Sequence, residues 1–148
     1  MSDMPFLNPT VLKQLDLPVP SRDETPKLLE PLNLNRSYHP SRELQAYSRL
    51  YGFDQLKCDY WQGYIQMPLF KLHVQVFKPL IENVKGTVCL LHGYLEHSGI
   101  YQPIIRELLE QGFSVLTYDL PGHGLSDGSP ANIKNFDHYQ DVLHAVYN

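Results

Sequence analysis

The chain of 148 residues has little cysteine, no long hydrophobic run and no excess of basic charge. Its two cysteines, Cys58 and Cys89, stand alone, so their spacing indicates neither a disulfide framework nor a zinc site. The apolar runs are only a few residues long, too short to span a bilayer. The first residues lack the basic and then apolar pattern of a secretory signal, so we expect a cytoplasmic protein without a transmembrane segment.

The charges are few and mixed along the chain. The formal net charge is -4, and charged residues make up 19% of the chain while apolar residues make up 43%. This composition is typical of a globular protein rather than of a disordered one. It provides no basic face, so we expect no nucleic-acid partner.

Proline is unevenly distributed. Seven of the twelve prolines fall within residues 1–40. Proline fixes φ and removes a backbone donor, so this part is predicted to be an extended, proline-rich leader. Residues 41–148 are predicted to form the N-terminal portion of a single folded domain.

Hydrophobic spacing predicts one helix and two strands at the start of that domain. Residues 41–50 have helical spacing, with Ser41 as the N-cap and Gly52 after the last turn. Residues 60–67 and 71–77 alternate apolar and polar side chains. We therefore expect two antiparallel strands with one face exposed to water.

The pattern then changes to continuous apolar runs. Residues 87–91 and 113–118 are predicted to be strands buried on both faces, with an apolar helical stripe in 100–109 between them. A last helical stripe begins at Phe136. The fold class is therefore α/β: antiparallel opening strands followed by a parallel βαβ unit, which together form an incomplete sheet. In such sheets ligands bind at the carboxyl ends of the parallel strands.

The first chemical motif follows the strand at 87–91. His92 and Gly93 form a sharp turn, because glycine leaves room for the backbone to change direction. The backbone N–H of Tyr94 then points towards the cleft, where an acyl-transfer reaction needs donors for its oxyanion. Tyr94 is the predicted oxyanion donor, and His92 and Gly93 shape its turn.

Two sequence blocks carry a family resemblance. His92-Gly93-Tyr94 is followed by Glu96-His97-Ser98 and then by Tyr101. The later block runs from Tyr118-Asp119 through Gly122-His123-Gly124 to Ser126-Asp127-Gly128. Both blocks, in this order and one helix plus one strand apart, resemble the monoacylglycerol lipase and bacterial lysophospholipase branch (S33 type) of the α/β-hydrolases.

This resemblance implies a Ser-His-Asp enzyme that hydrolyses carboxylic esters with a lipid-like acyl group and needs no cofactor. Its partner is a small ester or lipid, and transient contact with a membrane surface is compatible with such a substrate. In this family the nucleophile follows the next strand along the chain. We therefore expect the chain to be a fragment that lacks the catalytic triad and is inactive by itself.

Ser126 lies in a literal Gly-x-Ser-x-Gly match, but it is rejected as the nucleophile. A nucleophile elbow requires a strand that runs directly into the serine and a helix that leaves from it. Here a loop already separates Ser126 from the preceding strand, and Pro130 follows closely. Ser126 is predicted to be a loop residue whose hydroxyl stabilises turns.

The remaining polar residues receive structural roles. The spacing of His92 and His97 does not match a His-Glu-x-x-His helix, so we expect no metal site. His97 and His123 are expected to bond loop backbone, and Asp119 to cap the glycine-rich turn. The glycines of that turn fit no phosphate-binding fingerprint and are predicted to allow close backbone packing.

Two alternative functions remain open. One keeps the fold but uses an aspartate nucleophile, as in epoxide hydrolases and dehalogenases; the residue at the elbow decides between them. The other is a non-catalytic interaction protein built on a truncated hydrolase scaffold. An open strand edge and exposed helix faces make that scaffold a poor free monomer, which favours an incomplete sequence over a purposely short one.

Overall fold

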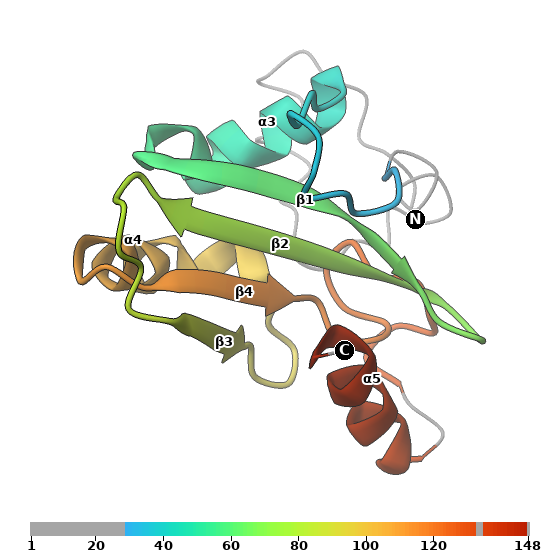
Figure 1. Cartoon of the computed structure of the whole chain (residues 1–148). Coiled ribbons are helices and arrows are strands. Elements are labelled where there is room, and N and C mark those ends of the chain that lie inside the picture. Colours follow the sequence, from blue (N-terminus) through green and yellow to red (C-terminus); the bar gives the residue numbers. More distant parts are fainter. Residues whose placement is uncertain (1–28, 133–134, 148) are drawn as a thin grey trace.

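The computed structural model describes residues 29–132 and 135–147 (Figure 1). Residues 1–28 of the predicted leader lie outside this part, so its extent stays a prediction. The helices and strands follow one another as α3 (Arg42–Tyr51), η1 (Phe53–Gln55), β1 (Cys58–Gln66), β2 (Lys71–Pro79), β3 (Thr87–Leu91), η2 (Ser98–Tyr101), α4 (Gln102–Glu110), β4 (Ser114–Tyr118) and α5 (Asp137–Tyr147). The order predicted from the sequence is confirmed.

The strands form one mixed sheet in the order β1-β2-β4-β3. β1 pairs with β2 and β2 pairs with β4 in antiparallel fashion, while β3 and β4 are parallel. The last pair is the predicted βαβ unit, because α4 connects its two strands. The fold class is α/β, as the sequence indicates.

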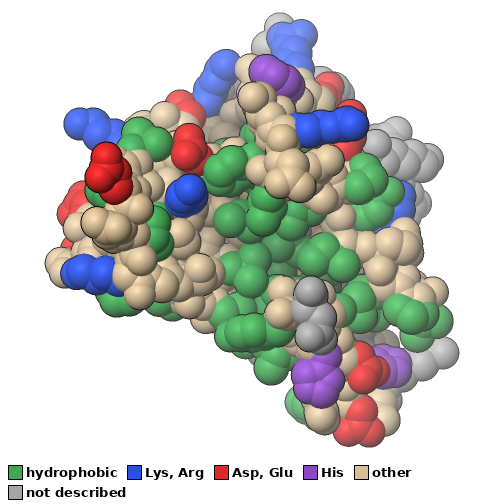
Figure 2. Space-filling model, in the orientation of Figure 1, with side chains coloured by type: hydrophobic (Ala, Val, Ile, Leu, Met, Phe, Trp, Pro, Cys, Tyr) green, Lys and Arg blue, Asp and Glu red, His purple; other side chains and the backbone are tan. Residues whose placement is uncertain are grey.

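Helices cover the sheet unequally on its two faces. α3 and α4 lie behind the sheet in Figure 1, and α5 lies in front of it near the carboxyl ends of β3 and β4. Behind the sheet, Phe77 and Val115 pack with Tyr47 of α3 and Ile105 of α4. In front, Val142 of α5 packs against residues of β2 and β4. Figure 2 shows hydrophobic side chains gathered in the middle of this front face.

Local sequence explains where α3 begins and ends. The Ser41 hydroxyl accepts a hydrogen bond from the Leu44 N–H at 3.3 Å, which satisfies one of the free donors of the first turn. Gly52 ends the helix with a left-handed φ of 74°. Both predicted signals are confirmed.

The predicted burial of the strands is wrong in two places. β2 does not leave one face wet, because the polar side chains of His73 and Gln75 are as buried as the apolar Leu72 and Val74. β3 is not buried on both faces, since its first and last residues are exposed and the residues between them are half-buried. It is also an edge strand, because within the described residues it pairs only with β4. Leu91, at its end, is 45% exposed.

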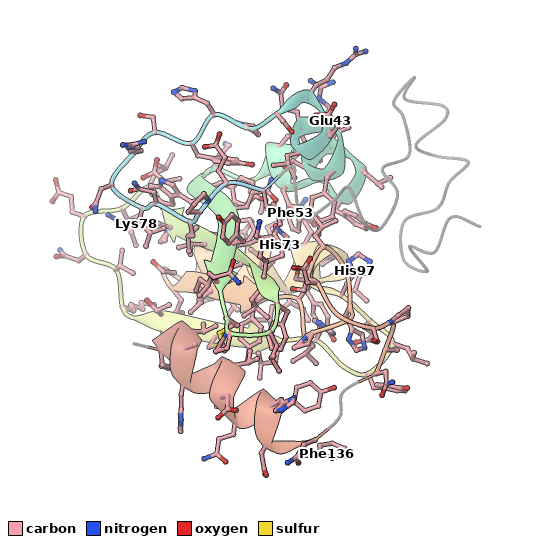
Figure 3. The ribbon with its side chains drawn as sticks, turned by 90° about the vertical axis from the view of Figure 1, so that its right-hand side faces the viewer. Glu43, Phe53, His73, Lys78, His97 and Phe136 are labelled. Atoms are coloured by element: carbon pink, nitrogen blue, oxygen red, sulfur yellow. The ribbon has the colours of Figure 1, made fainter. Side chains whose placement is uncertain are left out.

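The last helix also differs from its predicted pattern. Phe136 belongs to the expected apolar stripe, yet it is 82% exposed and lies at the outer end of α5 (Figure 3). α5 begins one residue later, at Asp137, so Phe136 precedes the helix. The buried residue of α5 is Val142, which the predicted stripe did not include, whereas Leu143 and Val146 of that stripe are half-buried.

Residues 30–32 run alongside β1. The Leu32 N–H donates to the Tyr64 carbonyl at 3.0 Å, and the Tyr64 N–H donates to the Glu30 carbonyl at 2.8 Å. A side chain at position 63 would collide with this segment, since a Cβ there would lie 2.7 Å from the Glu30 carbonyl oxygen. Gly63 therefore allows the segment to lie directly on the strand.

Candidate functional site: the turn after β3 and the buried polar network

The predicted oxyanion turn lies at the carboxyl end of β3, and His92 fixes it. The Nδ1 of His92 lies 2.7 Å from the Gly93 carbonyl oxygen, and its Nε2 accepts a hydrogen bond from the Leu120 N–H at 2.9 Å. A carbonyl can only accept and a backbone N–H can only donate, so the ring is neutral with its proton on Nδ1. His92 thus connects the turn to the loop that follows β4.

Glu96 holds the other side of the turn. Its carboxylate accepts hydrogen bonds from the Gly93 N–H at 3.0 Å and from the Tyr101 hydroxyl. The bond from Tyr101 is the main reason that the pKa of Glu96 is lowered, and the Gly93 N–H lowers it further. Because the Gly93 N–H is already bonded, it is not free to bind an oxyanion.

The backbone N–H of Tyr94 has no partner among the hydrogen bonds of the described residues. The Tyr94 hydroxyl donates to the Ala131 carbonyl at 3.2 Å, and its ring lies edge-on to His123 at 5.9 Å. The His92 ring lies 5.3 Å from the same histidine. The fold thus brings the two sequence blocks together around Tyr94 and leaves its N–H available.

Asp119 is the centre of a buried network directly beside this turn. It is fully buried, and Oδ1 accepts both the backbone N–H and the hydroxyl of Ser98, at 2.8 and 2.7 Å. Oδ2 accepts the Leu125 N–H at 2.9 Å and lies 2.8 Å from His73 Nδ1. The predicted cap is confirmed, but Asp119 also joins β2 and the start of η2.

His73 makes this a buried ion pair. Its Nδ1 faces Asp119, and its Nε2 faces the side-chain oxygen of Gln62 at 3.0 Å, so both ring nitrogens donate to oxygen. Burial raises the pKa of the Asp119 carboxyl, but the hydrogen bond and charge of His73 outweigh this and hold it well below its usual range. The charge of His97 and the Leu125 N–H contribute in the same direction.

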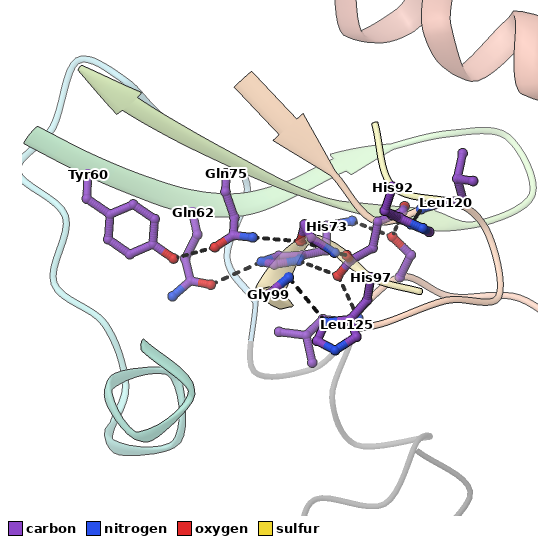
Figure 4. A network of polar contacts seen from close by, with 12 residues as sticks. Tyr60, Gln62, His73, Gln75, His92, His97, Gly99, Leu120 and Leu125 are labelled. Atoms are coloured by element: carbon purple, nitrogen blue, oxygen red, sulfur yellow. Dashed lines mark hydrogen bonds and ion pairs between the residues drawn. The ribbon is translucent and has the colours of Figure 1, made fainter. Parts of the chain in front are cut away.

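The network continues across the sheet, as Figure 4 shows. Gln75 donates to the Ser98 hydroxyl at 2.7 Å and accepts from the Tyr60 hydroxyl at 2.7 Å. Sequence reasoning missed His73, Gln75 and Gln62. Their signal was present, because His73 and Gln75 stand two residues apart on one face of a strand, and polar alternation was interpreted only as exposure.

The other loop histidines bond backbone, as predicted. His97 Nδ1 accepts the Gly99 N–H at 3.1 Å, and His123 Nδ1 donates to the Pro121 carbonyl at 3.0 Å. His97 is almost fully buried, and this burial lowers its pKa although Asp119 opposes the shift. Both histidines therefore stabilise the loops around the turn.

Ser126 does not occupy an elbow. It is buried, its hydroxyl donates to the Asp119 carbonyl at 2.6 Å, and it accepts the His73 N–H at 2.9 Å. A hydroxyl with both roles filled inside the protein cannot present itself to a substrate. The prediction of a structural loop serine is confirmed.

The glycines of this loop permit close packing, as predicted. Gly124 has a φ of 49°, and a Cβ there would collide with the Asp119 carboxylate. Gly122 has a φ of 74°, and a Cβ there would collide with the Ser129 carbonyl.

Across residues 29–132 and 135–147 no group of three His, Cys, Asp or Glu side chains could hold a metal ion. No helix in that part of the chain has the length and apolar character to cross a membrane.

Comparison with known proteins agrees with these motifs. Residues 82–148 match the model of the family described as serine aminopeptidase, S33. The matched segment contains β3, the turn, β4 and the glycine-rich loop. Residues 82–148 are therefore similar to the S33-type α/β-hydrolases, and the resemblance carried by the two sequence blocks is confirmed.

Two relatives illustrate the similarity. Caffeoylshikimate esterase of Arabidopsis thaliana is 41% identical over 68 residues, which cover 45% of this chain and 20% of the esterase. A monoglyceride lipase homolog of Monkeypox virus is 34% identical over 76 residues, covering 51% of this chain and 27% of the homolog. The similarity therefore spans about a fifth to a quarter of the length of these relatives.

Solved structures with a related arrangement include a CIB-like hydrolase of Thermoplasma acidophilum. It has a TM-score of 0.49 at 16% identity and covers 60% of this chain and 44% of that one. Acetyl xylan esterase 1 of Thermoanaerobacterium has a TM-score of 0.45 at 18% identity, covering 77% and 34%.

Proposed function

We propose that this chain provides half of the oxyanion hole of a serine-type carboxylic ester hydrolase. The observation that carries the proposal is the unpartnered N–H of Tyr94 at the carboxyl end of β3. As the carbonyl of a bound ester becomes tetrahedral, its oxygen gains negative charge, and this N–H would donate to it. One such donor typically lowers the barrier by roughly 2.7–4 kcal/mol.

The surroundings of Tyr94 support this role because they fix the donor in advance. His92 holds the Gly93 carbonyl, and Glu96 holds the Gly93 N–H. A donor that is already oriented needs no reorganisation during the reaction, which is the condition for effective oxyanion stabilisation.

The proposed substrate class is a small ester of the monoacylglycerol or lysophospholipid kind. Two of the relatives are named as an esterase and as a monoglyceride lipase homolog, and both names describe ester hydrolysis. We propose no cofactor and a cytoplasmic location.

The described residues contain no serine at a strand-to-helix elbow, since Ser126 is enclosed in its loop. We therefore propose that the 148-residue chain is inactive by itself and that a longer form supplies the serine, the histidine and the acid. The purified chain, incubated with p-nitrophenyl butyrate and with a monoacylglycerol, should show no turnover above a heat-denatured control. Turnover by the chain would contradict this part of the proposal.

The role of Tyr94 is tested in the longer, active form. Tyr94→Pro removes the backbone N–H, and Tyr94→Phe retains it. Tyr94→Pro should lower kcat by about 100-fold or more, whereas Tyr94→Phe should stay near the parent value. Equal loss in both variants would show that the side chain, rather than the N–H, matters.

A further inference from the structure

Gly93 joins two peptide planes, and their relative orientation sets the direction of the Tyr94 N–H. A peptide unit is planar, so the Gly93 carbonyl and the Tyr94 N–H turn together, and only φ and ψ of Gly93 link them to the preceding peptide. Glycine restricts these two angles less than any other residue does. The oxyanion donor therefore keeps one direction only if other groups hold both planes.

Hydrogen bonds hold both planes. The Gly93 carbonyl, in the second plane, lies 2.7 Å from His92 Nδ1 and accepts the Glu96 N–H at 3.2 Å. The Gly93 N–H, in the first plane, donates to Oε2 of Glu96 at 3.0 Å. The first plane thus depends on where the Glu96 carboxylate lies, and the other hydrogen bond of that carboxylate within the described residues comes from the Tyr101 hydroxyl.

Tyr101 is a fixed point from which to hold Glu96. Its hydroxyl donates to Oε2, the same carboxylate oxygen that accepts the Gly93 N–H. The Tyr101 ring is half-buried and packs against the hydrophobic cluster behind the sheet. Its backbone belongs to η2, whose first residue, Ser98, is bound to the buried Asp119. The hydroxyl is therefore held from the core of the protein.

The electrostatics of the three groups agree with this arrangement. The Tyr101 hydroxyl lowers the pKa of Glu96, and the Glu96 side chain raises the pKa of Tyr101. The Gly93 N–H lowers both pKa values, so it lies near both side chains. At neutral pH the carboxylate is charged and the phenol keeps its proton. One oxygen thus accepts while two groups donate, which a carboxylate oxygen can do.

We propose that Tyr101 is a positioning residue of the oxyanion hole. Through the shared oxygen of Glu96, its hydroxyl fixes the first peptide plane of the turn and so the direction of the Tyr94 N–H. The inference rests on the proposed function of Tyr94, to which it adds a residue that acts through Glu96.

Hydrogen exchange of the Gly93 amide, measured by NMR on the 148-residue chain, tests the geometry without an assay of activity. Tyr101→Phe keeps the ring in the hydrophobic cluster and removes only the hydroxyl. The released Glu96 side chain then populates other rotamers, so exchange at Gly93 should become about tenfold faster. Exchange at Leu120, which His92 holds, should not change, and Tyr147→Phe, at an exposed tyrosine of α5, is the matched control. Unchanged exchange at Gly93 in Tyr101→Phe overturns the proposal.

Variants of Glu96 test whether Tyr101 acts through it. Glu96→Gln keeps an oxygen that can accept both hydrogen bonds and should retain most of the protection at Gly93, whereas Glu96→Ala should lose it. In the Glu96→Ala background, Tyr101→Phe should add no further change, because its route to Gly93 is already gone. A further loss in the double variant contradicts the proposed route. If Tyr101→Phe does not fold, Glu96→Ala decides, because unchanged exchange at Gly93 in that variant also overturns the proposal.

The longer, active form tests the consequence for catalysis. Tyr101→Phe should lower kcat by about tenfold and leave KM within about twofold, because a displaced donor weakens binding of the transition state and not of the ester. Tyr94→Pro is measured alongside. If Tyr94→Pro lowers kcat and Tyr101→Phe does not, the positioning role is wrong and the proposed oxyanion donor stands. If Tyr94→Pro has no effect, the proposed function itself is wrong.

Discussion

The imidazole of His92 bonds the backbone N–H of Leu120 at 2.9 Å, although the two residues are 28 positions apart. His92 follows β3 and Leu120 follows β4, so this bond joins the carboxyl ends of the two parallel strands. The other ring nitrogen holds the Gly93 carbonyl. One side chain therefore sets both the shape of the turn and its position relative to the neighbouring loop.

Replacing His92 tests this relationship. His92→Ala leaves the half-buried Leu120 N–H without an acceptor and should lower the free energy of unfolding by about 1–3 kcal/mol. Urea denaturation measures the loss, and hydrogen exchange of the Leu120 amide should become faster. His39→Ala changes an exposed histidine and is the control. Unchanged exchange at Leu120 would show that the bond does not hold the loop.

Asp119 is expected to be the most sensitive position in the buried network. Asp119→Asn removes a carboxylate that accepts four hydrogen bonds, and it leaves His73 buried without its counter-charge. The free energy of unfolding should fall by about 3–5 kcal/mol. Asp54→Asn, at an exposed aspartate of η1, should fall within about 0.5 kcal/mol of the parent in the same urea titration. A loss equally small at Asp119 would argue against the ion pair.

The same carboxylate predicts how stability depends on pH. The pKa of Asp119 is lower in the folded chain than its unfolded value of about 3.9, so below that value the unfolded state binds a proton that the folded state does not. Its contribution is therefore complete above about pH 5 and is lost as the pH falls. In urea titrations between pH 3 and 7, the difference in midpoint between the parent and Asp119→Asn should become smaller as the pH falls. A constant difference between them would contradict the linkage.

Ser126 should matter for stability and not for catalysis. Ser126→Ala removes the donor to the Asp119 carbonyl and the acceptor of the His73 N–H, at an expected cost of about 1–3 kcal/mol. A fluorophosphonate probe should label neither the parent nor this variant, and Ser129→Ala, at an exposed serine, should leave stability unchanged. Labelling that disappears with Ser126→Ala would identify Ser126 as a nucleophile.

The glycine-rich loop can be tested at Gly124. Gly124→Ala places a Cβ against the Asp119 carboxylate at a positive φ, and it should cost more than about 1 kcal/mol. Gly52 also has a left-handed φ, of 74°, but a Cβ there meets nothing closer than 3.6 Å, which is ordinary contact. Gly52→Ala thus measures the cost of the left-handed backbone, and the larger loss in Gly124→Ala should be the cost of the collision. Equal losses would mean that the carboxylate moves aside freely.

The sequence was sufficient to place the helices, the strands and the turn, because these depend on local spacing and on residues such as Ser41 and Gly52. The two family blocks also identified the turn at Tyr94. The sequence could not predict which side chains are buried when their burial depends on partners distant in the chain. His73 looks exposed by its alternation, yet Asp119, 46 positions later, satisfies it inside the protein.

Local sequence patterns also could not show whether a strand lies at the edge or in the centre of the sheet. The apolar run at 87–91 indicates a strand, but only the strand order shows that β3 lies at an edge with Leu91 exposed. Similarly, the spacing of Phe136 fits the stripe of α5, but the helix begins after it. The spacing of apolar residues shows which side of a helix or strand each residue faces. The packing of neighbouring helices and strands determines whether that side is buried.

Gly63 determines whether residues 30–32 can pack on β1. Residues 30–32 lie on β1 only because no side chain projects there, and the same segment lines a cavity of about 520 Å³ together with Leu44 of α3 and Trp61 of β1. A single methyl group at position 63 would lift that wall while leaving the sheet and the turn after β3 in place. A residue larger than glycine at position 63 would therefore remove the cavity and leave the hydrolase motifs unchanged.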